Sequence, residues 1–227
     1  MDFIKKLTQK QIRLIVLGMI ILLSLIVLEE IVDDIFSDPL IGDTETLIFD
    51  NNVLKALREM RSPELNQSMV DITALGSFSV ITLLTCIITI FLLAHKDWKG
   101  LMYIFVMGVG TSIIPVMLKS YFLRDRPDPS SQIAYAQHSS FPSGHSFGAT
   151  VAYFSMAFLL TRELKVVKLE FLYYFLAILV VLLVGTSRMY LGVHYPTDVI
   201  GGICSGLIWF SLVSMPFIYF SKAYKSV

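Results

Sequence analysis

Long runs of uncharged, mostly apolar residues recur along the chain, and the charged residues collect in the shorter segments between them. A helix that spans a bilayer needs about 20 mostly apolar residues, and six runs approach that length. They are Leu14–Leu28, Ile72–Ala94, Gly100–Leu118, Ser146–Thr161, Phe171–Ser187 and Val199–Ser221. The pattern predicts an all-α, polytopic membrane bundle with six transmembrane helices. Because no internal repeat or low-complexity linker divides the chain, we expect one integral membrane domain over residues 1–227.

The first run is the shortest of the six. It can be extended from Ile12 to Val32 if the guanidinium of Arg13 reaches back to the membrane interface. A cleaved signal peptide is the alternative interpretation, but the run ends in Glu29 and Glu30 and no small-x-small cleavage site follows. We therefore expect a membrane span here.

Lys and Arg residues indicate the orientation of such a bundle, because they are enriched in short cytoplasmic loops. With six spans, both chain ends and two short loops lie on one side, and these four places hold 11 of the 18 basic residues. They are Lys5, Lys6, Lys10, Arg13, Lys96, Lys99, Arg162, Lys165, Lys168, Lys222 and Lys225. The pattern predicts cytoplasmic N- and C-termini.

Three connections lie on the opposite, extracytoplasmic side. The first, roughly Asp33–Gln67, contains an amphipathic stretch at Glu45–Arg61. That stretch is either an interfacial helix at the outer surface or an ordinary loop helix packed on the bundle. The other two, about Lys119–His145 and Arg188–Asp198, hold almost every chemically unusual residue. We therefore expect the active site on the extracytoplasmic side.

Composition supports a membrane protein and argues against nucleic-acid binding. Hydrophobic residues make up 55% of the chain and charged residues 16%, against about 25% charged in a typical soluble protein. Basic and acidic residues number 18 each, so the chain lacks the excess of basic residues that a nucleic-acid partner needs. Cys86 and Cys204 both lie in apolar runs and are interpreted as small buried hydrophobic residues.

The two unusual connections contain more cations than carboxylates at the ends of spans. Lys119, Arg126 and Arg188 face a single candidate carboxylate, Asp198. Ionisable groups at membrane depth are costly and are usually functional or paired. A dianionic phosphate would balance this excess, because guanidinium groups bind its oxygens in pairs.

Ion pairs with nearby carboxylates are the alternative explanation for part of this positive charge. Asp125 and Asp128 could neutralise Arg124 and Arg126. Arg124 itself is interpreted as a solvated loop charge. Lys119 and Arg126 are seven residues apart, so they would share one helix face if the third span extended that far.

The segment Pro142-Ser143-Gly144-His145 ends a loop and opens a helix. Ser143 is a natural N-cap, and Gly144 has no side chain to obstruct a ligand. Free N–H groups at a helix start favour anions. His194 and Asp198 are four residues apart at the start of the last span, so the carboxylate can fix the imidazole tautomer. His145, from another helix start, is a candidate general acid.

Three motifs in the second half of the chain resemble the signature motifs of the type-2 phosphatidic acid phosphatase superfamily in residue type, spacing and order. They are Lys119-x6-Arg126-Pro127, Pro142-Ser143-Gly144-His145 and Ser187-Arg188-x5-His194-x3-Asp198. The resemblance covers a motif core of about Lys119–Asp198 and implies the membrane branch of the family. Size and layout are most similar to those of bacterial phosphatidylglycerophosphatases of the B type, which implies a bacterial cell membrane.

The resemblance implies a role for each motif residue. His194 would be the nucleophile that forms a phosphohistidine, Asp198 would orient it, and His145 would protonate the leaving oxygen and later activate water. The phosphoryl group would be held by Lys119, Arg126, Ser143, Gly144 and Arg188. From the residues alone, only the nearby Asp198 favours His194 over His145 as the nucleophile.

The predicted function is therefore hydrolysis of a lipid phosphomonoester, either phosphatidylglycerol phosphate or phosphatidic acid, without a metal or other cofactor. No obligate protein partner is evident. An undecaprenyl diphosphate phosphatase and a phosphotransferase are alternatives. A membrane protein that binds or transports an anion would explain the cations but not the histidines. A metal hydrolase using His145, His194 and Asp198 is disfavoured by the three neighbouring cations.

Overall fold

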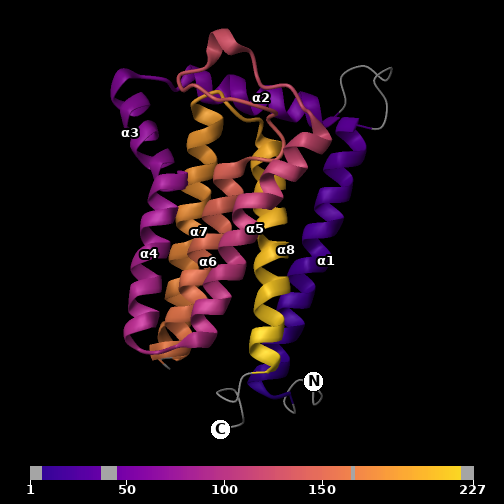
Figure 1. Ribbon diagram of the computed structural model, residues 1–227. Coiled ribbons are helices and arrows are strands. Elements are labelled where there is room, and N and C mark those ends of the chain that lie inside the picture. The colour runs from indigo at the N-terminus through magenta and orange to yellow at the C-terminus, as the bar shows by residue number, and fades with distance from the viewer. Residues whose placement is uncertain (1–6, 37–44, 165–166, 221–227) are drawn as a thin grey trace.

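The computed structural model describes residues 7–36, 45–164 and 167–220, and Figure 1 shows a bundle of long helices with shorter segments across one end. These residues form eight α-helices and one 3-10 turn, with no β-strand, as the all-α prediction required. The helices are α1 (Gln9–Phe36), α2 (Glu45–Glu59), α3 (Pro63–Ala74), α4 (Phe78–Ala94), α5 (Trp98–Phe122), α6 (Gly144–Leu164), α7 (Val167–Tyr190) and α8 (Pro196–Tyr219), and the turn is Pro129–Ser131. Outside the described residues lie the predicted cytoplasmic Lys5, Lys6, Lys165, Lys222 and Lys225, and Ser221 at the end of the last predicted span.

Short polar side chains begin several of these helices. Ser62, Ser77 and Asp97 precede α3, α4 and α5, and each accepts a hydrogen bond from the backbone N–H three residues later. At the other end of α5, Leu123 adopts the left-handed conformation with φ 49° and ends the helix. The helix of the third predicted span therefore stops before Arg126, so the condition under which Lys119 and Arg126 would share one helix face is not met.

Four helices of the described chain are long and apolar enough to cross a membrane: α1, α5, the Leu169–Tyr190 part of α7, and α8. The pair α3 and α4 is a fifth candidate if it counts as one span with a bend of 41°. Large apolar side chains on these helices point outward; Leu23 is 62% exposed, Ile90 67% and Phe105 71%. Such an apolar exterior suits contact with lipid. The protein is an integral membrane protein.

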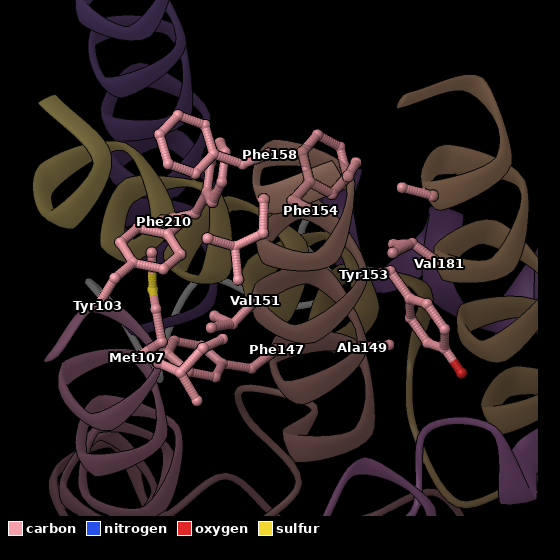
Figure 2. Packing of buried hydrophobic residues seen from close by; sticks show 14 of the residues in the cluster. Tyr103, Met107, Phe147, Ala149, Val151, Tyr153, Phe154, Phe158, Val181 and Phe210 are labelled. Carbon is pink, nitrogen blue, oxygen red and sulfur yellow. The ribbon is translucent and has the colours of Figure 1, made fainter. Parts of the chain in front are cut away.

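The remaining predicted span is α6, which lies among the other helices. It packs against α5, α7 and α8, and its Ser146, Thr150 and Ser155 are all buried. Because its neighbours are helices rather than lipid, it does not need a uniformly apolar sequence. Figure 2 shows Phe154 and Phe158 of α6 beside Phe210 of α8, with ring centroids 5.5 and 6.4 Å from Phe210.

Glycines allow α8 to approach the start of α6 closely, as helix packing in membranes commonly requires. A Cβ atom on Gly202 would lie 2.5 Å from the carbonyl oxygen of Ser143, and one on Gly206 would lie 2.9 Å from Thr150. The two helix starts that carry the predicted histidines are thereby held side by side. Of the two cysteines, Cys204 is buried as predicted, but Cys86 is exposed on α4.

The two ends of the bundle differ in construction. Lys10 at the start of α1 donates to the carbonyl oxygen of Tyr219 at the end of α8, so the first and last described helices meet at one end. At the other end α2 lies across the bundle beside the loops after α5 and α7 (Figure 1). Asp50 and Leu54 of α2 are buried there, so the predicted amphipathic helix packs on the bundle.

Candidate active site

His194 and Asp198 form the centre of the site, at the start of α8. The imidazole Nδ1 of His194 lies 3.3 Å from Oδ2 of Asp198, and both side chains are buried. Pro196 at the first helical position turns the chain so that the loop histidine meets the carboxylate one turn inside the helix. The same Oδ2 accepts the backbone N–H of Tyr195 at 2.9 Å, which holds the carboxylate in place.

This arrangement assigns the tautomer of His194. With Nδ1–H donating to Asp198, Nε2 carries the lone pair, and Nη1 of Arg126 lies 3.4 Å from it. Burial lowers the pKa of His194 to about 4, although the hydrogen bond to Asp198 raises it. The imidazole is therefore neutral near pH 7, as a nucleophile must be.

Arg126 is held by backbone carbonyl groups of two loops. Its guanidinium donates to the carbonyl oxygens of Gln137, His138, Ser139 and Val193. These bonds fix the guanidinium beside His194. Among the described residues it has no carboxylate partner, so its positive charge remains available to an anion.

Lys119, at the end of α5, reaches the same loop. Its Nζ donates to the carbonyl oxygen of Ser139 at 2.5 Å and to that of Ser140 at 3.2 Å. Arg126 donates to the Ser139 carbonyl as well, at 3.4 Å. The loop after α5, rather than a continuous helix, therefore brings the two motif cations together.

Arg188, near the end of α7, is 6% exposed and its Nη1 donates to Oγ1 of Thr73 on α3 at 3.1 Å. Its Nε is buried without a hydrogen-bond partner among the described residues, as is Oγ of Ser139. Buried polar groups are almost always satisfied, so an unpaired guanidinium N–H at this position suits a ligand that accepts hydrogen bonds.

The start of α6 supplies backbone donors beside these cations. Oγ of Ser143 accepts the backbone N–H of Ser146, as predicted for an N-cap. The next two residues, Gly144 and His145, open the helix, where backbone N–H groups have no intrahelical partner. A Cβ atom on Gly144 would lie 4.0 Å from Cε of Lys119, so the helix start adjoins that lysine.

His145 belongs to the same cluster. Burial and, after it, the neighbouring Arg188, His194, Arg126 and Lys119 lower the pKa of its imidazole, and a bound phosphate dianion would counteract these positive charges. Its backbone carbonyl and Cβ adjoin Gly76 at the break between α3 and α4, where an added Cβ would lie 3.2 and 3.3 Å away. The eight residues predicted for the site, from four separate segments, thus come together at one end of the bundle.

Arg124 corrects the sequence interpretation, which made it a solvated loop charge. Its side chain is only 8% exposed and bridges Oδ1 of Asp198 at 2.7 Å and Oδ2 of Asp50 at 2.8 Å. The suggested local neutralisation by Asp128 is also wrong: within the described residues this carboxylate forms no ion pair with Arg126, and it accepts from Ser130 at the 3-10 turn.

Asp50 of α2 is a site residue that sequence reasoning missed. It is fully buried and accepts the backbone N–H and the hydroxyl of Thr197 at 3.0 and 2.6 Å. Its position in an amphipathic helix, 74 residues before Arg124, gave no signal. No group of three His, Cys, Asp or Glu side chains in the described residues is placed to hold a metal ion.

Comparison with known proteins gives consistent matches. The family model of the PAP2 superfamily matches residues 99–220. Phosphatidylglycerophosphatase B of Bacillus subtilis (strain 168) is 38% identical over 166 residues, which cover 72% of this chain and 81% of the relative. Undecaprenyl-diphosphatase BcrC of the same strain is 26% identical over 149 residues, which cover 63% of this chain and 70% of the relative.

A solved structure resembles the fold over nearly its whole length. The crystal structure of a transmembrane PAP2-type phosphatidylglycerolphosphate phosphatase from Bacillus subtilis matches with a TM-score of 0.78 and 32% sequence identity. The match covers 91% of this chain and 98% of that chain. This match extends well beyond the segment of the family model, which begins at residue 99, into the N-terminal part of the chain.

Proposed function

This chain belongs to the PAP2 superfamily, and we propose that it is a lipid phosphatase that hydrolyses the phosphomonoester of phosphatidylglycerol phosphate. The observation that carries the proposal is the placement of His194 between Asp198 and Arg126. An anion-binding protein has no need of an oriented, neutral imidazole beside a cation. The curated relative with 38% identity is named for the same activity.

In the proposed reaction, the lone pair of His194 Nε2 attacks phosphorus. The phosphorus–oxygen bond to the glycerol breaks, and the leaving oxygen takes a proton from His145. A water molecule then attacks the phosphohistidine while His145 accepts its proton. The phosphorus–nitrogen bond breaks, inorganic phosphate leaves, and His194 regains its lone pair.

The positive side chains and helix N–H groups supply the electrostatic part of this mechanism. Charge spreads over three phosphoryl oxygens in the transition state, so catalysis depends on positioning and charge stabilisation. We assign the oxygens to Lys119, Arg126 and Arg188, with Ser143 and the Gly144 N–H at the start of α6. This set needs no metal ion, and no obligate protein partner is required.

We further propose six spans, with α3 and α4 together as one and α6 as another. Cytoplasmic termini then place the site at the extracytoplasmic surface, as the distribution of Lys and Arg predicts. The whole chain, residues 1–227, would act as one domain around a motif core at 119–198.

The acyl chains of the substrate have a candidate position. A cleft of about 590 Å³ between α4, α5 and α6 is lined mainly by apolar side chains, and its lining includes Ile81, Val151 and the polar Thr111. Ile81 and Thr111 also adjoin Gly148, which is less than one helical turn from His145. A lipid could therefore enter sideways, with its tail in this cleft and its phosphate at the histidines.

A phosphate-release panel in detergent tests the proposal. It compares phosphatidylglycerol phosphate, phosphatidic acid, lysophosphatidic acid and undecaprenyl diphosphate. We expect the largest kcat/KM for phosphatidylglycerol phosphate. A clear preference for undecaprenyl diphosphate would favour the alternative lipid, and no release from any substrate would favour an anion-binding protein.

Two additions to the same assay test the chemistry. EDTA should leave the rate unchanged, and an EDTA-dependent loss restored by a divalent ion would contradict the metal-free mechanism. Vanadate should inhibit, because it adopts the five-coordinate geometry of the phosphoryl group in transfer. Full activity in millimolar vanadate would contradict the assigned phosphate site.

A further inference from the structure

Arg124 stands apart from the three cations assigned to phosphate. Its guanidinium lies between two fully buried carboxylates, with Nη1 2.7 Å from Asp198 and Nη2 2.8 Å from Asp50. Nη1 also donates to Oγ1 of Thr197 at 2.8 Å. Arg124 is therefore committed to protein acceptors on two sides, and its contacts are with the carboxylate behind the nucleophile rather than with the phosphate cradle.

The two oxygens of Asp198 have different partners. Oδ2 receives Nδ1 of His194 and the Tyr195 backbone N–H, whereas Oδ1 receives Arg124. A carboxylate held at both oxygens cannot rotate about its terminal torsion. Arg124 thereby keeps Oδ2 directed at the imidazole.

Asp50 completes the arrangement from α2. It accepts from Arg124 and from the backbone N–H and hydroxyl of Thr197, so it joins α2 to the first turn of α8. Burial raises the pKa of Asp50, while hydrogen bonds from Thr197 and Arg124 lower it. A lone buried carboxylate is costly, and a shared guanidinium between two of them offsets that cost.

From this geometry, and resting on the proposed function, we propose that Arg124 is a positioning residue for the catalytic carboxylate and that Asp50 is its anchor. Arg124 fixes Asp198, which in turn fixes the tautomer and direction of His194. The chemical step, rather than substrate binding, should then depend on Arg124. Asp50 should act on the reaction only through Arg124 and Thr197.

The first test compares Arg124→Gln, Arg124→Lys and Asp50→Asn in the full-length protein with phosphatidylglycerol phosphate in detergent. We expect Arg124→Gln to lower kcat about 10- to 100-fold, as loss of groups that orient a reactive ligand commonly does. KM should change less than about threefold, because the lost contact is not with substrate. Arg124→Lys should recover part of kcat, because the ammonium can reach one carboxylate.

Two reference variants show whether the effect of Arg124→Gln comes from positioning of Asp198, from weaker phosphate binding or from the loss of any ion pair. Arg126→Gln should raise KM as well as lower kcat. Arg162→Gln removes the ion pair with Asp97 at the opposite end of the bundle and should keep wild-type kcat. Wild-type kcat in Arg124→Gln, or a change confined to KM, would overturn the proposal. Absence of phosphate release by the wild type would instead refute the proposed function.

A double-mutant cycle in thermal unfolding tests the anchor without using activity. Arg124→Gln and Asp50→Asn should each lower Tm, and the double variant should lose clearly less than the sum, because each single change breaks the same contact. Additive losses would overturn the assignment of Asp50. If Arg124→Gln does not fold, the cycle is run with Arg124→Lys, which keeps the charge.

Discussion

The two ends of the bundle both bury cationic side chains but surround them differently. At the end where α1 begins and α8 ends, Arg13 and Arg162 are partly buried, and each lies against a carboxylate from another part of the chain. The pairs are Arg13 with Glu170 and Arg162 with Asp97. At the other end Lys119, Arg126 and Arg188 are hydrogen-bonded to carbonyl and hydroxyl oxygens, and none of them forms an ion pair within the described residues.

The difference shows which cations stabilise the fold and which are available to bind a ligand. A cation paired with a carboxylate is neutralised, so it holds parts of the fold in place rather than binding an anion. A cation held by neutral oxygens keeps its charge for a ligand, at a cost in desolvation that a bound anion offsets. Arg124 is the intermediate case, because it lies at the active end but is paired as at the opposite end.

The strongest test of the difference between the two ends is to substitute one histidine at each end. His194→Ala should lower phosphate release by at least about 10⁴-fold, because the nucleophile is lost. His95→Ala, in an exposed residue after α4, is the matched control and should retain wild-type rates. Release is measured with each protein shown to be folded by thermal unfolding. Near-normal activity of His194→Ala would contradict the nucleophile assignment.

A smaller effect is expected from adding one methyl group at each end. Gly76→Ala places a Cβ 2.5 Å from Cγ1 of Val184 and 3.2 Å from the His145 carbonyl oxygen, so Val184 must shift and His145 must give by a few tenths of an ångström. We expect kcat to fall on the order of tenfold, since small misplacements of reacting groups are costly.

The matched control for that change is Gly18→Ala in α1. Its Cβ would lie 3.5 Å from the flexible end of Met215, an ordinary contact. We expect unchanged kcat and an unchanged or slightly raised Tm, because alanine favours a helix. Equal losses of activity in both variants would mean that the site end is no more sensitive to packing than the rest.

The smallest predicted effect is a pH dependence of stability at the site. The pKa of His194 is lowered to about 4 by burial, from an ordinary value near 6.5. Between these pH values the unfolded chain binds a proton at His194 that the folded chain does not. The contribution of neutral His194 to the free energy of unfolding is therefore complete above pH 6.5 and is lost as pH falls toward 4.

Thermal unfolding of the wild type and His194→Asn between pH 7 and pH 4.5 measures this contribution. The asparagine cannot titrate, so Tm of the wild type should fall further, by on the order of a few degrees. Parallel Tm curves for the two proteins would show that His194 is not buried in its neutral form.

Sequence reasoning predicted the parts of the site whose partners are close in the chain. His194 meets Asp198 within one turn, and Ser143 caps the helix that it precedes. It misjudged Arg124, because the nearest carboxylate in sequence, Asp125, is not its partner, and the true partners are 74 residues away in both directions. Such pairing depends on tertiary packing, which no local pattern encodes.

The same limit explains the helix predictions. The apolar runs predicted the lipid-facing helices α1, α5 and α7 well, because lipid contact demands an apolar sequence. The end of α5 was not predicted, since Leu123 in the left-handed conformation has no sequence signal comparable to glycine. The weak apolar character of α6 has its reason in a central position that only the assembled bundle reveals.

The contact between Asp50 and Thr197 also has a practical consequence for protein engineering. The segment matched by the family model, residues 99–220, contains every signature residue, yet the acceptor for the first amide of α8 comes from far outside it. Transplanting or expressing that segment by itself would remove one of the two carboxylates that pair with Arg124, and the acceptor of the first amide of α8. The segment that must be expressed to keep the site intact is therefore longer than the segment that the family model matches.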